Sequence, residues 1–79
     1  MKQPLKQKNA YEFTDFDITI ILLLSQGKLQ KDIPAYLQEN NIKPSGLSSI
    51  EKRLNIMKEE LSFDKNEQLV AYCKDFGII

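Results

Sequence analysis

The chain has 79 residues, 42% of them apolar and 28% charged, which suits one small globular domain with a modest core. It contains no histidine and one cysteine, which excludes imidazole catalysis, histidine-based metal sites, an internal disulfide and multi-cysteine zinc sites. Eleven basic residues balance eleven acidic residues, and this zero net charge taken alone argues against a nucleic-acid partner.

The sequence carries no signal for a membrane span. Its longest apolar stretch, Ile18–Leu24, is far shorter than the roughly 18 residues that cross a bilayer. No apolar run directly follows the first lysines, so we expect no secretory signal peptide and a cytoplasmic location. Cys73 lies among helix-forming residues, where we expect a buried apolar side chain rather than a reactive thiol.

Residues 1–12 are polar and aperiodic, which predicts a flexible N-terminal segment or linker ahead of a domain over 13–79. Thr14 and Asp17 then form a capping-box pattern with Asp in place of the usual Glu or Gln.

We predict a first helix over 15–25. Phe13 and Ile18 are placed to form a hydrophobic staple at its start. Gly27 is expected to end it, since glycine reaches φ > 0 without steric cost.

A short second helix is predicted over 33–39. Pro34 fits only a first helical turn, so Asp32 is the expected N-cap, and Asn40-Asn41 should end the helix. The segment that follows, residues 42–47, is rich in helix breakers.

The third helix is predicted from about 46 or 49 to 61, with Ser48 and Glu51 as a second capping box. Helical spacing gives it an apolar stripe of Ile50, Leu54, Met57 and Leu61. The same spacing gives it an opposite, polar stripe of Ser48, Lys52, Asn55 and Glu59.

A fourth helix follows, with Asp64 and Glu67 as its predicted capping box and Gly77 as its end. Ile78-Ile79 can then fold back on the core. Four helices with short connections and no alternating strand pattern predict an all-α domain. Two short helices followed by a longer one with a polar outward face is the order found in a helix-turn-helix.

Five segments of residues 13–79 stand in an order typical of one family. They are Phe13-Thr14-x-x-Asp17, Ile21-Leu22-x-Leu24-x-x-Gly27, Lys31-Asp32-Ile33-Pro34-x-x-Leu37, Ser49-Ile50-x-x-Arg53 and Phe76-Gly77-Ile78-Ile79. In this order they resemble the LuxR-type (GerE-like) helix-turn-helix domain at the C-terminus of many bacterial response regulators.

The resemblance implies a four-helix LuxR-type fold and a sequence-specific DNA-binding transcription regulator. It would be the output domain of a two-component response regulator or a small standalone regulator. The third helix would enter the major groove of double-stranded DNA, and the last helix would pair two copies as a homodimer.

The chain also departs from the family pattern. The connection between Leu37 and Ser49 is longer, Arg53 replaces a histidine, Glu51 stands at an often basic position, and Pro34 replaces an alanine.

Nine residues are the candidate DNA contacts. Lysines neutralise phosphates, and arginine can also form two hydrogen bonds with guanine. Asparagine can hydrogen-bond adenine, and serines at a helix start can bind phosphate. The candidates are Lys28, Lys31, Lys43, Ser45, Ser48, Ser49, Lys52, Arg53 and Asn55. The alternatives are ordinary ones: solvated charges for the basic residues and plain capping for the serines.

Charge is distributed unevenly. Residues 28–53 carry five basic against three acidic residues and residues 1–12 three against one, so each segment is net +2, while 13–27 and 54–79 are each net −2. This favours one mildly basic face and weak, salt-dependent binding by one copy.

The rival hypothesis is a helix-turn-helix-like protein-interaction module without DNA binding, favoured by Glu51, the longer turn and the zero net charge. We find no catalytic pattern and expect neither an enzyme nor a cofactor, metal or small-molecule substrate.

Overall fold

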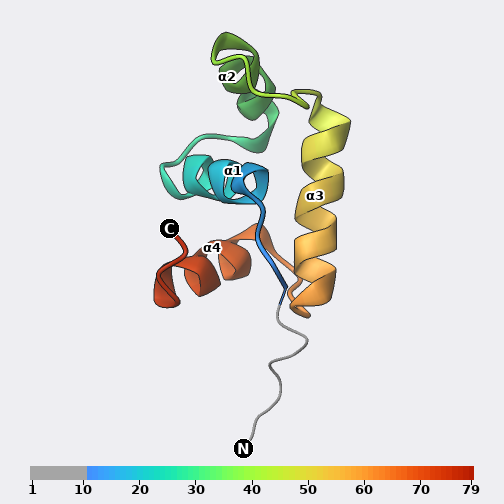
Figure 1. The fold of residues 1–79 in the computed structure, drawn as a ribbon. Helices are drawn as coiled ribbons and strands as arrows, with labels where there is room; N and C mark the ends of the chain where they lie inside the picture. The colour runs from blue at the N-terminus through green and yellow to red at the C-terminus, as the bar shows by residue number, and fades with distance from the viewer. Residues whose placement is uncertain (1–10) are drawn as a thin grey trace, which may run out of the picture.

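The computed structural model describes residues 11–79, and these form an all-helical domain without strands. The elements are α1 (Asp15–Ser25), a 3₁₀ turn η2 (Gln30–Asp32), α2 (Ile33–Glu39), α3 (Leu47–Glu60) and α4 (Asn66–Asp75). α1 and α4 lie side by side across α3, and α2 packs on the N-terminal end of α3 (Figure 1). The prediction of four helices in an all-α domain is confirmed for this part of the chain.

The start of α1 follows its sequence signals closely. The Thr14 hydroxyl accepts from the Asp17 N–H at 3.1 Å, and the Asp17 carboxylate accepts from the Thr14 N–H at 3.1 Å. This reciprocal pair is the predicted capping box, and it satisfies two backbone donors that a helix start leaves unpaired.

All four helices end in the same way. Each is followed by a residue in the left-handed region, and these residues are Gly27 (φ 90°), Asn41 (φ 57°), Ser62 (φ 60°) and Gly77 (φ 70°). The next N–H then bonds back to a carbonyl five residues earlier, which closes a Schellman motif. The predicted ends at Gly27, Asn40-Asn41 and Gly77 are therefore confirmed.

The predicted bounds of α2 and Asp32 as its N-cap position are confirmed, but the predicted caps of the other helices need correction. The Asp32 side chain does not cap α2; the η2 turn leads into the helix instead, and Pro34 occupies its first turn. The Ser48–Glu51 capping box is wrong, because α3 starts at Leu47 with Gly46 as N-cap, two residues earlier than a Ser48 cap would place it and close to the alternative predicted start at 46. The Asp64–Glu67 box is also wrong: Gln68 Oε1 accepts from the N–H groups of Asp64 and Lys65, at 2.7 and 2.9 Å.

One continuous core lies where α1, α2 and α4 meet the inner side of α3. Three of the four residues of the predicted α3 stripe are buried, and Leu61 packs against them. The buried apolar residues are Ile20, Ile21, Leu23, Ile33, Leu37, Ile50, Leu54, Met57, Leu69 and Cys73. Ile78 and Ile79 pack against this core, so the chain does fold back after α4 as predicted.

The domain begins earlier than the predicted boundary at residue 13. Tyr11 is half-buried, packs against the core and stacks edge-on with Phe13 at a ring-centroid distance of 5.1 Å. The predicted flexible segment 1–12 otherwise lies outside the described residues.

No helix in residues 11–79 has both the length and the apolar character of a membrane span.

Cys73 is expected to resist thiol reagents as long as the domain is folded. Burial, with a smaller contribution from the Asp17 charge, raises the pKa of its thiol to about 11, so little reactive thiolate exists at pH 7. Ellman's reagent should modify the native protein at least about tenfold more slowly than the protein unfolded in urea. Equal rates would contradict the buried position.

Candidate nucleic-acid interface

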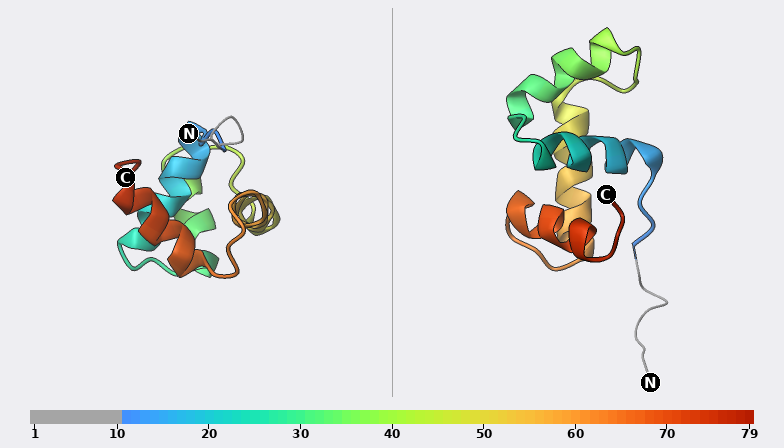
Figure 2. Two further views of the ribbon diagram at one scale, coloured as in Figure 1. Left: turned by 90° about the horizontal axis from the view of Figure 1, so that it is seen from below. Right: turned by 90° about the vertical axis from the view of Figure 1, so that its left-hand side faces the viewer.

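No other helix of residues 11–79 covers the outer side of α3. Figure 1 and the end-on view in Figure 2 both place α3 at the edge of the domain, with the other helices on one side of it. Ser48, Lys52, Asn55 and Glu59 are all exposed, so the predicted polar stripe is confirmed. With 14 residues, α3 is about 21 Å long, which is enough to lie across a DNA major groove about 12 Å wide.

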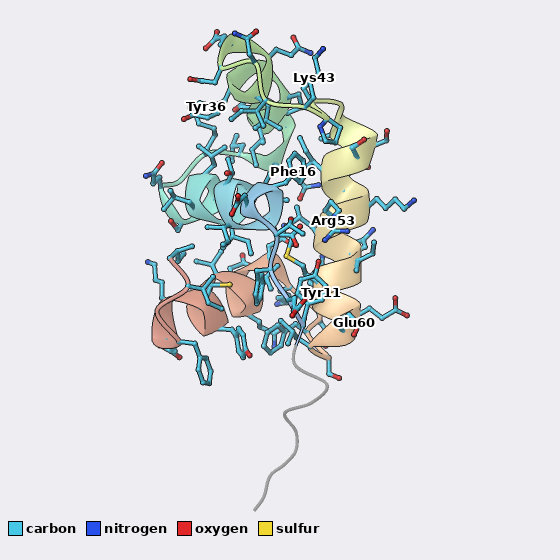
Figure 3. The ribbon with its side chains drawn as sticks, viewed as in Figure 1. Tyr11, Phe16, Tyr36, Lys43, Arg53 and Glu60 are labelled. Carbon is cyan, nitrogen blue, oxygen red and sulfur yellow. The ribbon has the colours of Figure 1, made fainter. Side chains whose placement is uncertain are left out.

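The N-terminal end of α3 carries no side-chain cap, because its N-cap is Gly46. The first backbone bond of the helix runs from the Ile50 N–H to the Gly46 carbonyl at 3.2 Å, so the preceding N–H groups have no partner within the helix. Uncapped N–H groups and the helix dipole favour a phosphate at this end. Lys43, labelled in Figure 3, lies just before it in the connection from α2, and Ser45 follows in the same connection.

A shallow hollow of about 390 Å³ runs along one flank of α3. Ser49, Lys52 and Arg53 line it from α3, and Pro44 and the start of α1 complete it. Six predicted residues therefore lie within the first nine residues of α3 or in the connection just before it: Lys43, Ser45, Ser48, Ser49, Lys52 and Asn55.

Arg53 departs from the prediction. Its Nε donates to Asp17 Oδ1 at 2.9 Å and its Nη2 donates to Asp17 Oδ2 at 2.8 Å, a two-pronged ion pair with a carboxylate that is fully buried. Nη2 also donates to the Tyr11 hydroxyl, which in turn donates to Asp17 Oδ2 at 2.7 Å (Figure 3). Pulling Arg53 onto DNA would leave a buried carboxylate without its cation, so we remove Arg53 from the candidate contacts.

The Asp17 carboxylate is the one buried charged group among residues 11–79. Burial alone raises its pKa, but hydrogen bonds from Arg53, Tyr11 and the Thr14 N–H, together with the Arg53 charge, outweigh burial and hold the pKa below its ordinary value. The carboxylate in turn raises the pKa of the Arg53 guanidinium. Burial and the Asp17 carboxylate raise the pKa of Tyr11 to about 12. All three groups keep the protonation states that the network needs at neutral pH.

Lys28 and Lys31 do not join the α3 cluster. Lys28 lines a different groove, and its Nζ lies 5.7 Å from the centre of the Tyr36 ring. Lys31 is exposed on η2. The five predicted basic residues therefore do not share one face, which differs from the expected single basic side.

The sequence does hold a signal for the Asp17–Arg53 pair. Asp17 stands three and four residues before the buried Ile20 and Ile21, and Arg53 stands three after Ile50 and four before Met57. Both positions thus lie on the core side of their helices by helical spacing. Two opposite charges on facing apolar stripes indicate a buried pair rather than surface contacts.

No protein-family model, curated protein or solved structure matches this chain. The LuxR-type resemblance therefore remains a prediction made from the residues. Within residues 11–79, no three His, Cys, Asp or Glu side chains are grouped so that they could hold a metal ion.

The Asp17 carboxylate should make folding sensitive to acid. The pKa of Asp17 is lower in the native protein than in the unfolded chain, so the unfolded chain binds a proton more readily. The contribution of Asp17 to stability is therefore complete above its unfolded pKa of about 4 and is lost as pH falls through its native pKa. Urea unfolding between pH 7 and pH 2 should show this loss in the wild type. Asp17→Asn should be less stable at pH 7 and show a flatter pH dependence; an unchanged slope would contradict the assignment.

Alanine substitutions at two neighbouring residues of α3 should change the stability of the domain by very different amounts. Arg53→Ala strands the buried Asp17 carboxylate and should lower the free energy of unfolding by about 3 kcal/mol. Lys52→Ala, at an exposed site, should change it by less than about 0.5 kcal/mol. Urea unfolding followed by circular dichroism compares the two, and equal effects would place Arg53 outside the packed network.

Proposed function

We propose that this chain binds double-stranded DNA through the N-terminal half of α3, as a LuxR-type transcription regulator acting in the cytoplasm. The observation that carries the proposal is the uncovered polar side of α3 with an uncapped N-terminus at one end. An α-helix presented in this way is the element that enters the major groove in helix-turn-helix proteins. The chain would serve as the output module of a two-component response regulator or as a standalone regulator.

The contacts divide by chemistry. Lys43 and Lys52 would neutralise phosphates, and the α3 N–H groups with Ser45 would bind a phosphate at the helix start. Asn55 and Ser48 project from the outer stripe, where their amide and hydroxyl groups can reach base edges.

The affinity of one copy should be low. Glu51, Glu59 and Glu60 are exposed on the same helix and repel phosphates, while Arg53 is paired with Asp17. Two linked copies would bind more tightly through effective concentration. We propose that they pair through the C-terminal end of α4. There Phe76 is 69% exposed and packs on Tyr72 with a ring-centroid distance of 4.6 Å.

The same three glutamates favour a second candidate function. A helix with an acidic outer side and no free arginine suits a protein partner better than a polyanion. In that case the chain would be a helix-turn-helix-like interaction module that does not bind DNA.

DNA binding can be separated from general charge attraction with two matched double variants. We expect the wild type to bind a labelled random-sequence duplex at about 50 mM salt, with a negative slope of log affinity against log salt. Lys43→Ala with Lys52→Ala should weaken binding and reduce that slope by about 2, since two phosphate contacts are lost. Fluorescence anisotropy over a salt series gives both quantities.

The control variant is Lys65→Ala with Lys74→Ala, which changes net charge equally but lies on α4 and its N-cap. It should leave the slope nearly unchanged. Equal losses in both variants would indicate unspecific attraction, and absence of binding by the folded chain would support the interaction module instead.

A further inference from the structure

A second concave site lies away from the outer stripe of α3. This basic groove, about 630 Å³ in volume, is bordered by four lysines, Lys28, Lys58, Lys65 and Lys74, contributed by the chain after α1, by α3 and by α4 and its N-cap. Lys58 and Ile56 are about 200° apart around α3, so the basic groove and the hollow that Ile56 lines lie on opposite flanks of that helix. We infer that the basic groove binds an acidic, amphipathic segment of a partner protein.

The charge of the basic groove is unbalanced. Its four lysines face a single acidic lining residue, Glu67. Within residues 11–79 the only ion pair is that of Arg53 with Asp17, so no described carboxylate lies within 4.0 Å of these four ammonium groups. Ammonium groups gathered around a concave surface raise the local concentration of anionic groups.

Apolar side chains also line the basic groove, and they favour an anionic ligand that itself carries apolar groups. Leu24, Leu29, Val70 and Ala71 line it, and Leu29 is 58% exposed although its side chain is large and apolar. A free phosphate or a DNA backbone would leave these side chains in water. A segment that carries leucine or phenylalanine between acidic residues would bury them and pair with the lysines at the same time.

One wall of the basic groove also holds an unpaired acceptor. Asn66 Nδ2 donates to Gln30 Oε1 at 3.0 Å, but the buried Asn66 Oδ1 accepts no hydrogen bond from residues 11–79. Buried acceptors normally have a donor. Because this oxygen has no contact with solvent, a bound segment would reach it only after the Asn66 side chain turned toward the groove.

Charge also argues against the nearest alternative occupants. Residues 1–10 contain three lysines and no acidic residue, so they do not complement the groove. A two-fold contact between copies centred on it would set each patch against itself, lysines facing lysines. An acidic partner of different sequence is therefore the occupant that fits.

The test uses the full chain and a fluorescein-labelled peptide of about 12 residues, half of them Asp or Glu, with leucine at helical i, i+3 and i+4 positions. Fluorescence anisotropy should show binding, and a peptide with Asn and Gln in place of the acids should bind at least about tenfold more weakly. Lys58→Glu with Lys74→Glu should also weaken binding at least about tenfold, and Leu29→Ser should weaken it independently of salt. Lys43→Glu with Lys52→Glu has the same charge change and should bind as the wild type does.

The remaining outcomes each overturn the inference. Equal loss in both double variants would mean general charge attraction. Full displacement of the peptide by random duplex DNA, with the basic-groove variant losing DNA affinity as strongly, would assign the groove to DNA. A dimer in sedimentation equilibrium that dissociates in the basic-groove variant would assign it to a second copy. Because the DNA titration relies on Lys43 and Lys52, failure of one proposal is distinguishable from failure of the other.

Discussion

The arrangement of this domain depends on one buried carboxylate. Asp17 has no contact with solvent and therefore needs compensation, which it receives from Arg53, Tyr11 and the Thr14 N–H. Because Asp17 lies in the first turn of α1 and Arg53 in the second turn of α3, the pair fixes how these helices cross. The same interaction turns Arg53 inward and leaves the outer stripe of α3 with Lys52 as its one exposed basic residue. An ion pair that orders the fold thus also limits the strength of the proposed interface.

The way α1 crosses α3 gives the surface of α3 three regions with different surroundings. Its inner stripe closes the core, its outer stripe is covered by no other helix of the described residues, and the flank beside Lys58 contributes to the basic groove. An outer stripe on DNA and a basic groove holding an acidic segment do not overlap, so both sites could be occupied together. Such a geometry would let a small domain join a nucleic acid to a second protein without a conformational change.

Local signals predicted the fold well, and contacts between distant residues decided the rest. The boundaries of α1 and α2, three of the four left-handed ends and the two stripes of α3 follow from spacing and from residues such as Thr14 and Gly27. Helix starts were less predictable, because Ser48 resembles a cap in sequence while Gly46 takes that position in the folded chain. The partner of Arg53 lies 36 positions away, and an outward placement was predicted although its spacing from Ile50 and Met57 pointed inward. The lysines of the basic groove are spread from 28 to 74, so no local pattern could have gathered them.

The uniform helix ends have a consequence for which sequences this fold accepts. Two of the four left-handed positions, Asn41 and Ser62, carry side chains at φ near 60°, a conformation that costs a residue other than glycine about 1 kcal/mol. Asparagine tolerates this conformation better than serine does, so Ser62 is the more strained of the two. Both positions should accept glycine or asparagine readily and should not accept β-branched residues. A glycine in place of Ser62, in the connection from α3 to α4, would therefore stabilise the domain.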